Sequence, residues 1–358
     1  MKVSVSVGTV LGLISAWALF SIAGNVSWYQ FTTAVGSVRN LLNLPQEDVQ
    51  KCINAYQYFM NGTHTSDTTE ETEHVRAYYA VINQVLAIAD IEKMYIPPQI
   101  DSKKGLFDNQ MIWEKRVAHT LNVGSDSKLL DIGCGRGRIS HHFQSIIGGK
   151  VSGFNIDANQ IQNAKEYALA TGLQDRLDFK VSDHHKRFPY EDESFDGAYS
   201  FQAVWPFFKV EELDSVANEM FRVLKPGSRY SCSEYLLTPH FNLQDKYHNE
   251  LHARFLPTLA ATQSRYPLEV TNALERAGFK LVLSAPSVAP AWPLTDQKTD
   301  LFLFMRSIVI GLTSIGMCPV WVETLVNNLF LGGVAWADAE KMKIADLSWQ
   351  IIVERPLK

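Results

Sequence analysis

The sequence predicts an α/β fold built around a parallel sheet, and three observations point to it. From Lys128 onward, short apolar strands alternate with helices of about ten to fifteen residues. A turn with glycine at every second position joins the first strand to the first helix, in "LLDIGCGRGRISHHF" from 129 to 143. The last strand lies at the extreme C-terminus. Such alternation is typical of βαβ units, whose crossover helices cover a parallel sheet.

Each element follows from its local pattern. Strands are predicted as short apolar runs at 128–133, 150–157, 176–183, 195–202, 228–237, 280–285 and 348–356. Helices are predicted at 77–95, 108–121, 138–147, 158–172, 211–225 and 267–279. Glycines at 148, 149 and 172 end two of these helices, and Pro226-Gly227 predicts a turn before the fifth strand. Pro97 and Pro98 separate the first two helices because proline cannot continue a helix.

Composition limits the function classes. With 46% hydrophobic residues, the 358-residue chain can form a full core. The net charge of −5 argues against a nucleic-acid partner, which usually selects a basic face. The four cysteines lie far apart and none forms a C-x-x-C pair, so neither a disulfide framework nor a metal site is expected. These features indicate a reduced, intracellular catalytic part.

The N-terminal residues 1–38 differ from the rest of the chain. No charged side chain occurs between Lys2 and Arg39, and about twenty apolar residues suffice for a helix to cross a bilayer. We expect a membrane anchor here, preceding the α/β domain. A cleaved signal peptide, with the small residues around Ala23 as its cleavage site, and a buried core helix are the alternatives.

The remaining chain divides into three segments. Residues 39–76 are interpreted as a linker, since 61–75 are polar and rich in Thr and Glu. Residues 77–285 contain the alternating core. Residues 286–358 contain an apolar helical insertion and the last strand. Such an insertion predicts either a lid or pocket wall, or ordinary core packing.

The glycine turn predicts a nucleotide-binding site. Glycines let the backbone approach a ligand, and the helix that follows presents free N–H groups. The motif D-x-G-x-G-x-G, from Asp131 to Gly137, lacks the spacing of a dinucleotide fingerprint and the lysine of a P-loop. It resembles the S-adenosyl-L-methionine (SAM) loop of class I methyltransferases. That resemblance implies a Rossmann-like, mixed seven-stranded sheet with helical insertions.

Three further sequence features fall at the distances that this class requires. Asn155, after the second strand, is placed to meet the ribose, where most of these enzymes carry an acid. Asp183, after the third strand, is placed to accept from the adenine amino group, with a turn or cap role as the alternative. "FRVLKPGS" matches the approach to the fifth strand. The candidate SAM-binding residues are Asp131, Gly133, Cys134, Gly135, Gly137, Asn155, Ile156, Gln160, Asp183, His184 and Gln202.

From 77 to the C-terminus the chain resembles the sterol C-methyltransferase family. The resemblance is carried by "GFNIDANQIQNAKEYALATGL", "FRVLKPGSRYSCSEYLLT" and "PLEVTNALERAGFKLV". The insertion in 286–358 is similar to the family's lipid-binding C-terminal region, which implies a lipid-acceptor role for it. Two departures concern the acceptor site. The family's aromatic Tyr-Glu-Tyr-Gly-Trp-Gly segment is replaced by "IADIEKMYIPPQ", with Tyr95 as its aromatic residue. The family's acid after the fourth strand is replaced by Gln202, with Trp205 nearby.

The resemblance implies attack of an acceptor carbon on the sulfonium methyl, which leaves a carbocation and requires a base. Aromatic faces stabilise cations, or else these aromatic residues simply pack in the core. The aromatic candidates are Tyr199, Phe201, Trp205, Phe207 and Phe208. The candidate bases, in order, are Glu234, His184 and His185, and Gln202 completes the set of candidate catalytic residues.

The sequence therefore predicts a membrane-associated, SAM-dependent C-methyltransferase for a sterol or related isoprenoid lipid. Transfer to nitrogen or oxygen of another small lipid-like acceptor is the alternative enzyme function. A non-catalytic SAM-binding subunit is the alternative outside enzymes. Because SAM is a cytosolic metabolite, we expect the catalytic part to face the cytosol from a membrane, the endoplasmic reticulum.

Overall fold

The computed structural model describes residues 36, 43–61, 68–88, 95–261, 263–291, 299–316 and 318–357. The chain separates into two compact units. One comprises Met1–Glu92 and Thr295–Leu331, and the other comprises Lys93–Leu294 and Gly332–Lys358. The predicted anchor at 1–38 lies outside the described residues, apart from Gly36. Within the described ranges, no helix combines the length and the apolar character that crossing a membrane requires.

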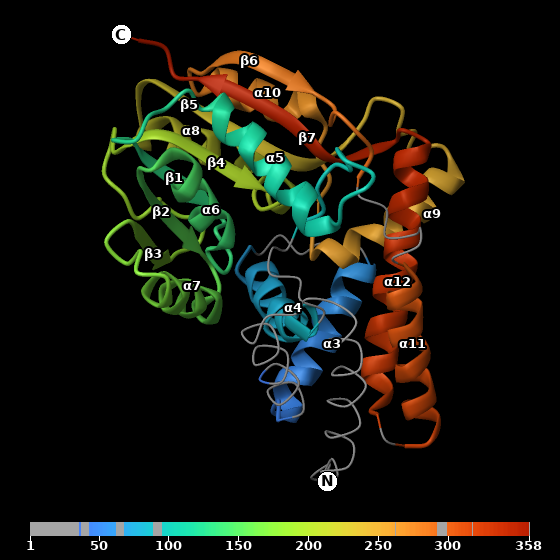
Figure 1. Cartoon of the computed structure of the whole chain (residues 1–358). Helices are drawn as coiled ribbons and strands as arrows, with labels where there is room; N and C mark the ends of the chain where they lie inside the picture. Colours follow the sequence, from blue (N-terminus) through green and yellow to red (C-terminus); the bar gives the residue numbers. More distant parts are fainter. Residues whose placement is uncertain are drawn as a thin grey trace. The chain divides into compact units, whose positions relative to one another are not determined.

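The second unit contains a seven-stranded sheet with the order β3-β2-β1-β4-β5-β7-β6 (Figure 1). The strands are β1 (Lys128–Ile132), β2 (Lys150–Asn155), β3 (Leu177–Val181), β4 (Phe195–Phe201), β5 (Leu224–Leu237), β6 (Lys280–Ala285) and β7 (Ala345–Glu354). β1 to β5 are parallel, and β7 runs antiparallel between β5 and β6. The predicted mixed seven-stranded α/β fold is thereby confirmed.

Helices cover both faces of this sheet. On one face, α5 (Leu106–Thr120), α6 (Arg138–Ile147) and α7 (Ala158–Ala170) enclose a core around Phe143 and Phe179. On the other face, α8 (Leu213–Val223) and α10 (Pro267–Arg276) enclose a core around Tyr230 and Met220. Adjacent residues of β1 illustrate the period of two, since Leu129 belongs to the first core and Leu130 to the second.

The turn predicted at Pro226-Gly227 is not a separate connection. α8 ends at Val223 and β5 begins at Leu224. The proline and glycine instead lie where the pairing register between β4 and β5 shifts. Gly227 has φ +82°, so this irregularity needs glycine. The strand therefore accommodates the interruption as a bulge.

A third core covers the carboxyl-terminal part of β5. It is formed by α9 (Lys246–Phe255), the short 3-10 helix η3 (Leu256–Leu259) and the end of α12 (Val320–Lys341). The Trp336 ring stacks on Phe255 at 3.9 Å between centroids and meets Tyr235 edge-on. α9 and η3 interrupt the strand–helix alternation between β5 and α10, and α12 belongs to the apolar insertion predicted before the last strand.

The first unit contains helices where the sequence analysis expected a linker. α3 (Gln46–Asn61) and α4 (Thr68–Ile88) occupy most of residues 39–76 and continue beyond them. Phe59 and Tyr78 are buried and meet edge-on at 5.8 Å between ring centroids. Glutamate is a good helix former, which explains how a polar segment can begin a helix. The helix predicted at 77–95 thus starts earlier, and Tyr95 lies in a bend outside it.

The C-terminal segment 286–358 does not form one part. α11 (Thr299–Ser314) and the beginning of α12 belong to the first unit, whereas the end of α12 and β7 belong to the second. Glu340, near the end of α12, accepts hydrogen bonds from the backbone N–H groups of Ala291 at 2.6 Å and Leu347 at 3.1 Å. These bonds hold the end of α12 to the strand that follows it.

Candidate functional site: the cofactor loop and its surroundings

The glycine turn between β1 and α6 is shaped by two different constraints. Gly133 and Gly137 have φ angles of +77° and +76°. A Cβ at Gly133 would lie 2.5 Å from the Cβ of Ala203, and one at Gly137 would lie 2.8 Å from Phe179. The glycines at these positions therefore make room for the protein's own side chains. At Gly135, with φ +52°, the sole neighbour of an added Cβ is the Gln160 Oε1 at 3.2 Å. Gly135 is thus the glycine where a ligand can approach the backbone.

Asp131 lies beneath this turn and is almost fully buried. Its Oδ2 accepts a hydrogen bond from the Ser140 hydroxyl at 2.6 Å. Burial raises the pKa of Asp131 to about 7, and the hydrogen bond from Ser140 opposes that shift. Cys134, also buried, donates its backbone N–H to the Phe154 carbonyl at 3.1 Å, so the turn is tied to β2. The loop is therefore fixed by the protein before any ligand binds.

The predicted ribose-binding residues lie beside Gly135. The Asn155 amide donates to the Gln160 Oε1 at 3.1 Å, so these two side chains form one polar group next to the turn. Asp157 has a different role, because it caps α7 by accepting from the backbone N–H groups of Asn159 and Gln160. Ile156 occupies the turn between Asn155 and that cap. The structure thus brings together the two amide side chains that the sequence proposed for the nucleoside.

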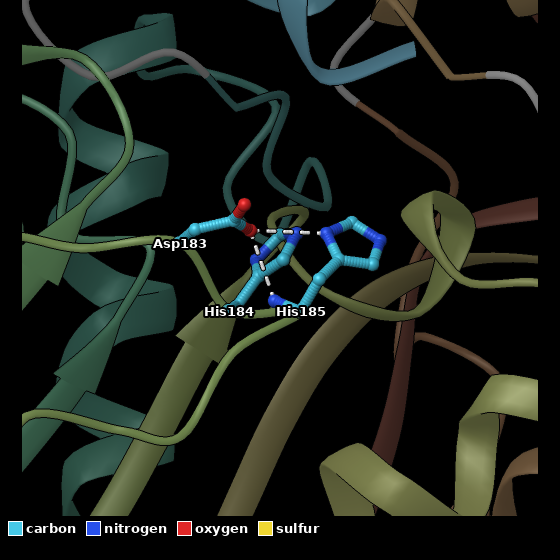
Figure 2. Close-up of side chains that lie close together, drawn as sticks. All are labelled: Asp183, His184 and His185. Carbon is cyan, nitrogen blue, oxygen red and sulfur yellow. Dashed lines mark hydrogen bonds and ion pairs between the residues drawn. The ribbon is translucent and has the colours of Figure 1, made fainter. Parts of the chain in front are cut away.

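Asp183, His184 and His185 form a compact cluster after β3 (Figure 2). The Asp183 Oδ1 accepts from the His185 backbone N–H at 2.9 Å and lies 3.1 Å from His185 Nδ1. The other ring nitrogen of His185 lies 2.9 Å from the Phe207 carbonyl oxygen. Since both nitrogens face oxygen acceptors, this arrangement favours a protonated His185.

The protonation states follow from these contacts. Burial raises the pKa of Asp183, but the hydrogen bonds from His185 outweigh it and bring the pKa down to about 2. For His185, burial lowers the pKa and the bonded Asp183 carboxylate raises it, with a net rise. Burial and the neighbouring His185 lower the pKa of His184 to about 3. At neutral pH, a carboxylate therefore faces a charged His185 beside a neutral His184.

The donor atoms of this cluster lie within 4.8 Å of one another, a spacing that a metal ion can bridge. Both ring nitrogens of His185 already face oxygen acceptors, so a metal would have to replace one of these contacts. Within the described ranges, no hydrogen bond to the second Asp183 oxygen is observed. That oxygen fits an amino group such as the one on adenine, which stays the predicted role of Asp183.

Glu234, the leading candidate base, is fully buried in β5. Its Oε1 accepts from the Ser200 hydroxyl at 2.6 Å, and its Oε2 accepts from the Ala203 backbone N–H at 3.1 Å. Burial raises the pKa of Glu234 to about 7. These contacts fix the turn after β4, and that turn packs against Gly133. A role in removing a proton from the acceptor stays a prediction.

Gln202 occupies the position where the sterol family carries an acid, and it connects three segments. Its Nε2 donates to the carbonyl oxygens of Ile96 at 3.0 Å and Leu347 at 2.5 Å. Its Oε1 accepts from the Ile96 N–H at 3.3 Å. The residue has φ +47°, a strained conformation for a side chain other than glycine. The amide therefore anchors the chain around residue 96.

The predicted aromatic group is not one cluster. Tyr199 stacks on Phe143 at 3.8 Å between ring centroids, and Phe201 belongs to the same core. Trp205 and Phe208 are buried in the core on the other face of the sheet. The Phe208 ring lies 4.9 Å from His184, and Phe207 lies 6.1 Å from it. The five residues do not form one group, because Tyr199 and Phe201 lie in β4 whereas Trp205, Phe207 and Phe208 follow it in and after the short 3-10 helix η1 (Trp205–Phe207). A role of any of them in stabilising a cation stays a prediction.

A buried polar group that the sequence analysis did not identify lies between α5 and α6. Glu114 is fully buried, accepts from the Tyr95 hydroxyl at 2.9 Å, and lies 2.5 Å from His142 Nδ1. The Tyr95 ring lies 5.0 Å from Phe201. A carboxylate that orients one ring nitrogen leaves the other able to exchange a proton. The signal in the sequence is Glu114 on the apolar face of a predicted helix, where a charge requires a partner.

Comparisons with known proteins agree with this geometry. Residues 124–278 match the family described as "Methyltransferase domain". The 24-methylenesterol C-methyltransferase 2 of Arabidopsis thaliana is 27% identical over 295 residues, which cover 80% of each chain. Squalene methyltransferase 1 of Botryococcus braunii is 30% identical over 241 residues, covering 63% of this chain and 62% of that protein. Sterol 24-C-methyltransferase ERG6B of Gibberella zeae is 27% identical, covering 68% of this chain and 70% of that protein.

Solved structures share the fold. Geranyl diphosphate C-methyltransferase from Streptomyces coelicolor A3(2) aligns with a TM-score of 0.56 at 16% identity, covering 80% of this chain and 98% of that chain. The cyclopropane synthase MmaA2 from Mycobacterium tuberculosis aligns with a TM-score of 0.58 at 14% identity, covering 73% of this chain and 90% of that chain.

The sheet order, the glycine loop and the polar groups around it define a class I methyltransferase that uses SAM. Within that class the chain resembles the sterol C-methyltransferases. The predicted enzyme class, cofactor and family resemblance are confirmed.

Proposed function

We propose that the enzyme transfers the methyl group of SAM to a carbon atom of a sterol or a related isoprenoid lipid. The main support is the extent of the similarity. It covers 80% of the chain in the relative named as a 24-methylenesterol C-methyltransferase, well beyond the matched methyltransferase domain at 124–278. Residues outside the cofactor domain, which select the acceptor in this fold, therefore share in the resemblance.

Bound SAM supplies an electrophilic methyl group on a sulfonium sulfur. The chain's own residues hold the nucleoside: Gly135 admits it to the backbone, while Asn155 with Gln160 and Asp183 offer hydrogen-bond partners. Asp131 lies below the loop as a buried carboxyl group. These contacts would orient bound SAM, and orientation of the reacting groups supplies much of the rate enhancement in such transfers.

A carbon acceptor must lose a proton after methylation. Among the predicted bases, Glu234 has both oxygens hydrogen-bonded, and His184 is neutral with a pKa of about 3. We propose Glu234 as the first residue to test, because its pKa of about 7 suits proton transfer at neutral pH. Tyr199, Trp205 and Gln202 stay candidates that shape the surroundings and do not themselves accept the proton.

Transfer to carbon is separated from the alternatives by one experiment. The purified full chain is incubated with methyl-labelled SAM and a lipid extract blocked in sterol methylation, and the labelled products are identified by mass spectrometry. Label on a carbon of a sterol or isoprenoid supports the proposal. Label on nitrogen or oxygen would assign a different acceptor, and tight SAM binding without any labelled lipid would assign a non-catalytic subunit.

We also propose that residues 1–38 anchor the enzyme in a membrane, that of the endoplasmic reticulum, with the catalytic part in the cytosol. The support is the uncharged segment between Lys2 and Arg39 and the cytosolic origin of SAM. Asn61 lies in an N-x-[ST] sequon and tests the orientation. An unmodified Asn61 is expected in cells, and a glycan there would contradict the proposed orientation.

A further inference from the structure

We propose that the hairpin formed by α11 and the beginning of α12 inserts its tip, residues 307–322, into one leaflet of a phospholipid bilayer. This membrane-docking surface is separate from the predicted N-terminal anchor and goes beyond the proposed methyl transfer. The sequence from 307 to 322 contains no charged residue. Arg306 and Glu323 stand at its two ends.

The exposed side chains of this hairpin are those that a bilayer accepts. Among the described residues from 306 to 331, the exposed ones are small, hydroxyl-bearing or apolar: Ser307, Gly311, Ser314, Ile315, Gly316, Val320, Thr324 and Leu331. Ile315 is 66% exposed and Val320 is 70% exposed, and both lie next to the turn. In contrast, the surface helix α7 exposes Lys165 and Glu166.

Exposure is spread around the helices and is not confined to one face. Ile308, Val309 and Ile310 are consecutive in α11, so their side chains point in directions about 100° apart. Each of them is partly exposed. A protein partner would cover a single face, whereas a helix that is apolar on all sides requires an apolar medium around it. This distribution identifies lipid as the occupant.

Three hydroxyl groups and the guanidinium of the hairpin make hydrogen bonds within it. The hydroxyls of Thr313, Ser314 and Thr324 donate to carbonyl oxygens three or four residues earlier, at 2.9, 2.7 and 3.1 Å. The Arg306 guanidinium donates to the Asn327 Oδ1 at 2.6 Å and lies 5.2 Å from the Phe330 ring centroid. Hydrocarbon offers no hydrogen-bond partners, so internal satisfaction is what insertion demands.

The dimensions fit one leaflet. Residues 307–314 form about 12 Å of helix at 1.5 Å per residue, and the turn that follows brings the depth close to half of a hydrocarbon core of about 30 Å. Pro319 lies in the turn, where the chain reverses direction. A hairpin of this length dips into the membrane and returns on the same side. An enzyme docked in this way would meet acceptor lipids where they are dissolved.

Cys318 provides a natural probe position. It is half-buried in the turn, whereas Cys52, Cys134 and Cys232 are buried. An environment-sensitive fluorophore is attached to Cys318 of the full chain, and phosphatidylcholine vesicles are added. The matched control carries Leu169→Cys in a Cys318→Ser background, because Leu169 on α7 is 66% exposed.

Two quenchers report the depth of each probe in vesicle-bound protein. We expect the Cys318 probe to lose quenching by aqueous iodide and to be quenched by doxyl groups on lipid acyl chains. The probe at 169 should keep iodide quenching even if residues 1–38 hold the chain on the vesicle. The double variant Ile315→Asp and Val320→Asp should restore iodide quenching of the Cys318 probe. Calorimetry should show unchanged SAM binding in this variant.

The proposal is overturned if, on the vesicle-bound chain, iodide still quenches the Cys318 probe and doxyl lipids do not. It is also overturned if iodide protection appears without vesicles and grows with protein concentration, since this would assign the surface to a second copy of the chain. Neither result depends on methyl transfer. Failure of the docking proposal would therefore leave the proposed methyltransferase function unaffected, and the labelled-SAM experiment tests that function separately.

Discussion

Gly133 and Gly137 cannot carry a side chain without moving their neighbours. Both have left-handed φ angles, and a Cβ added at either position would lie less than 3 Å from a neighbouring side chain. We expect Gly133→Ala to lower the free energy of unfolding by about 3 kcal/mol, combining backbone strain with overpacking against Ala203. Chemical denaturation measures this value. Loss of SAM binding should accompany it, because the loop would shift.

Gly135 gives the matched comparison. Its φ is also positive, but the nearest atom to an added Cβ is the end of the flexible Gln160 side chain. We expect Gly135→Ala to cost about 1 kcal/mol of stability from backbone strain. SAM binding, measured by calorimetry, should still fall, because the methyl group would occupy the approach to the backbone. Equal destabilisation by the two alanine variants would contradict this division of roles.

The Asp183–His185 pair makes stability depend on pH. The lowered pKa of Asp183 contributes stability above its unfolded value, near 3.9, that is lost as pH falls toward about 2. The raised pKa of His185 contributes stability below its unfolded value, near 6.5, that is lost as pH rises through the folded value. His185→Gln should therefore cost most near pH 5, about 2 kcal/mol, and much less above pH 8. Thermal unfolding across this range tests it, and a constant difference would exclude the charged pair.

For single residues, the sequence predicted where they lie better than what they do. The glycine motif and the strand ends placed Asp131, Asn155 and Asp183 at or just after the ends of β1, β2 and β3, which are neighbouring parallel strands. The role of Gln202 could not be predicted, since its partners at 96 and 347 are far away in the chain. The pairing of Glu114 with His142 likewise depends on how two helices pack.

At the scale of elements, α12 packs closely at one glycine. A Cβ at Gly332 would lie 2.1 Å from the Thr258 Cγ2 and 3.1 Å from the Arg254 carbonyl oxygen. We expect Gly332→Ala to destabilise the enzyme by about 2 kcal/mol through overpacking. Gly311 in α11 has no atom within 4 Å of its added Cβ. Gly311→Ala should stabilise by about 0.5–1 kcal/mol, as alanine favours helix. Equal effects in denaturant titrations would show that the packing at Gly332 is loose.

The buried face of α5 gives a second prediction for an element. Glu114→Gln keeps an oxygen for the Tyr95 hydroxyl but removes the charge beside His142. We expect a loss of about 1–3 kcal/mol in the free energy of unfolding, the usual cost of an impaired buried hydrogen bond. Lys115→Ala, at an exposed position of the same helix, is the control for general damage to α5. If Glu114→Gln unfolded no more easily than wild type, the pair would contribute nothing to stability.

Local sequence patterns predicted the existence of the strands better than the boundaries of the helices and strands. All seven strands were predicted, because buried strands leave short apolar runs bounded by turn residues. The prediction of a linker was wrong where Thr and Glu residues begin α4, because a short polar sequence on the surface is the same in a helix and in a loop. The strand β5 continues through Pro226 because pairing with its neighbours compensates for a local interruption.

At the scale of the whole molecule, the cofactor should stabilise the fold by mass action. SAM at a hundred times its dissociation constant adds about 2.7 kcal/mol to the free energy of unfolding. The demethylated product should act in the same way. A thermal-shift titration measures this gain, and the Gly135→Ala variant should lose most of it. A shift of equal size in that variant would place the cofactor elsewhere.

The hydrogen bonds of the Gln202 amide limit which residue can replace it. Its amide nitrogen faces two carbonyl oxygens, and its amide oxygen faces an N–H, so the site fits an amide in a single orientation. A carboxylate has no hydrogen to give and would repel both carbonyls. Introducing an acid at 202 by a single exchange would thus release residue 96 without recreating the electrostatics that the family resemblance implies. Engineering toward the family's acceptor preference must begin by rebuilding that neighbouring segment.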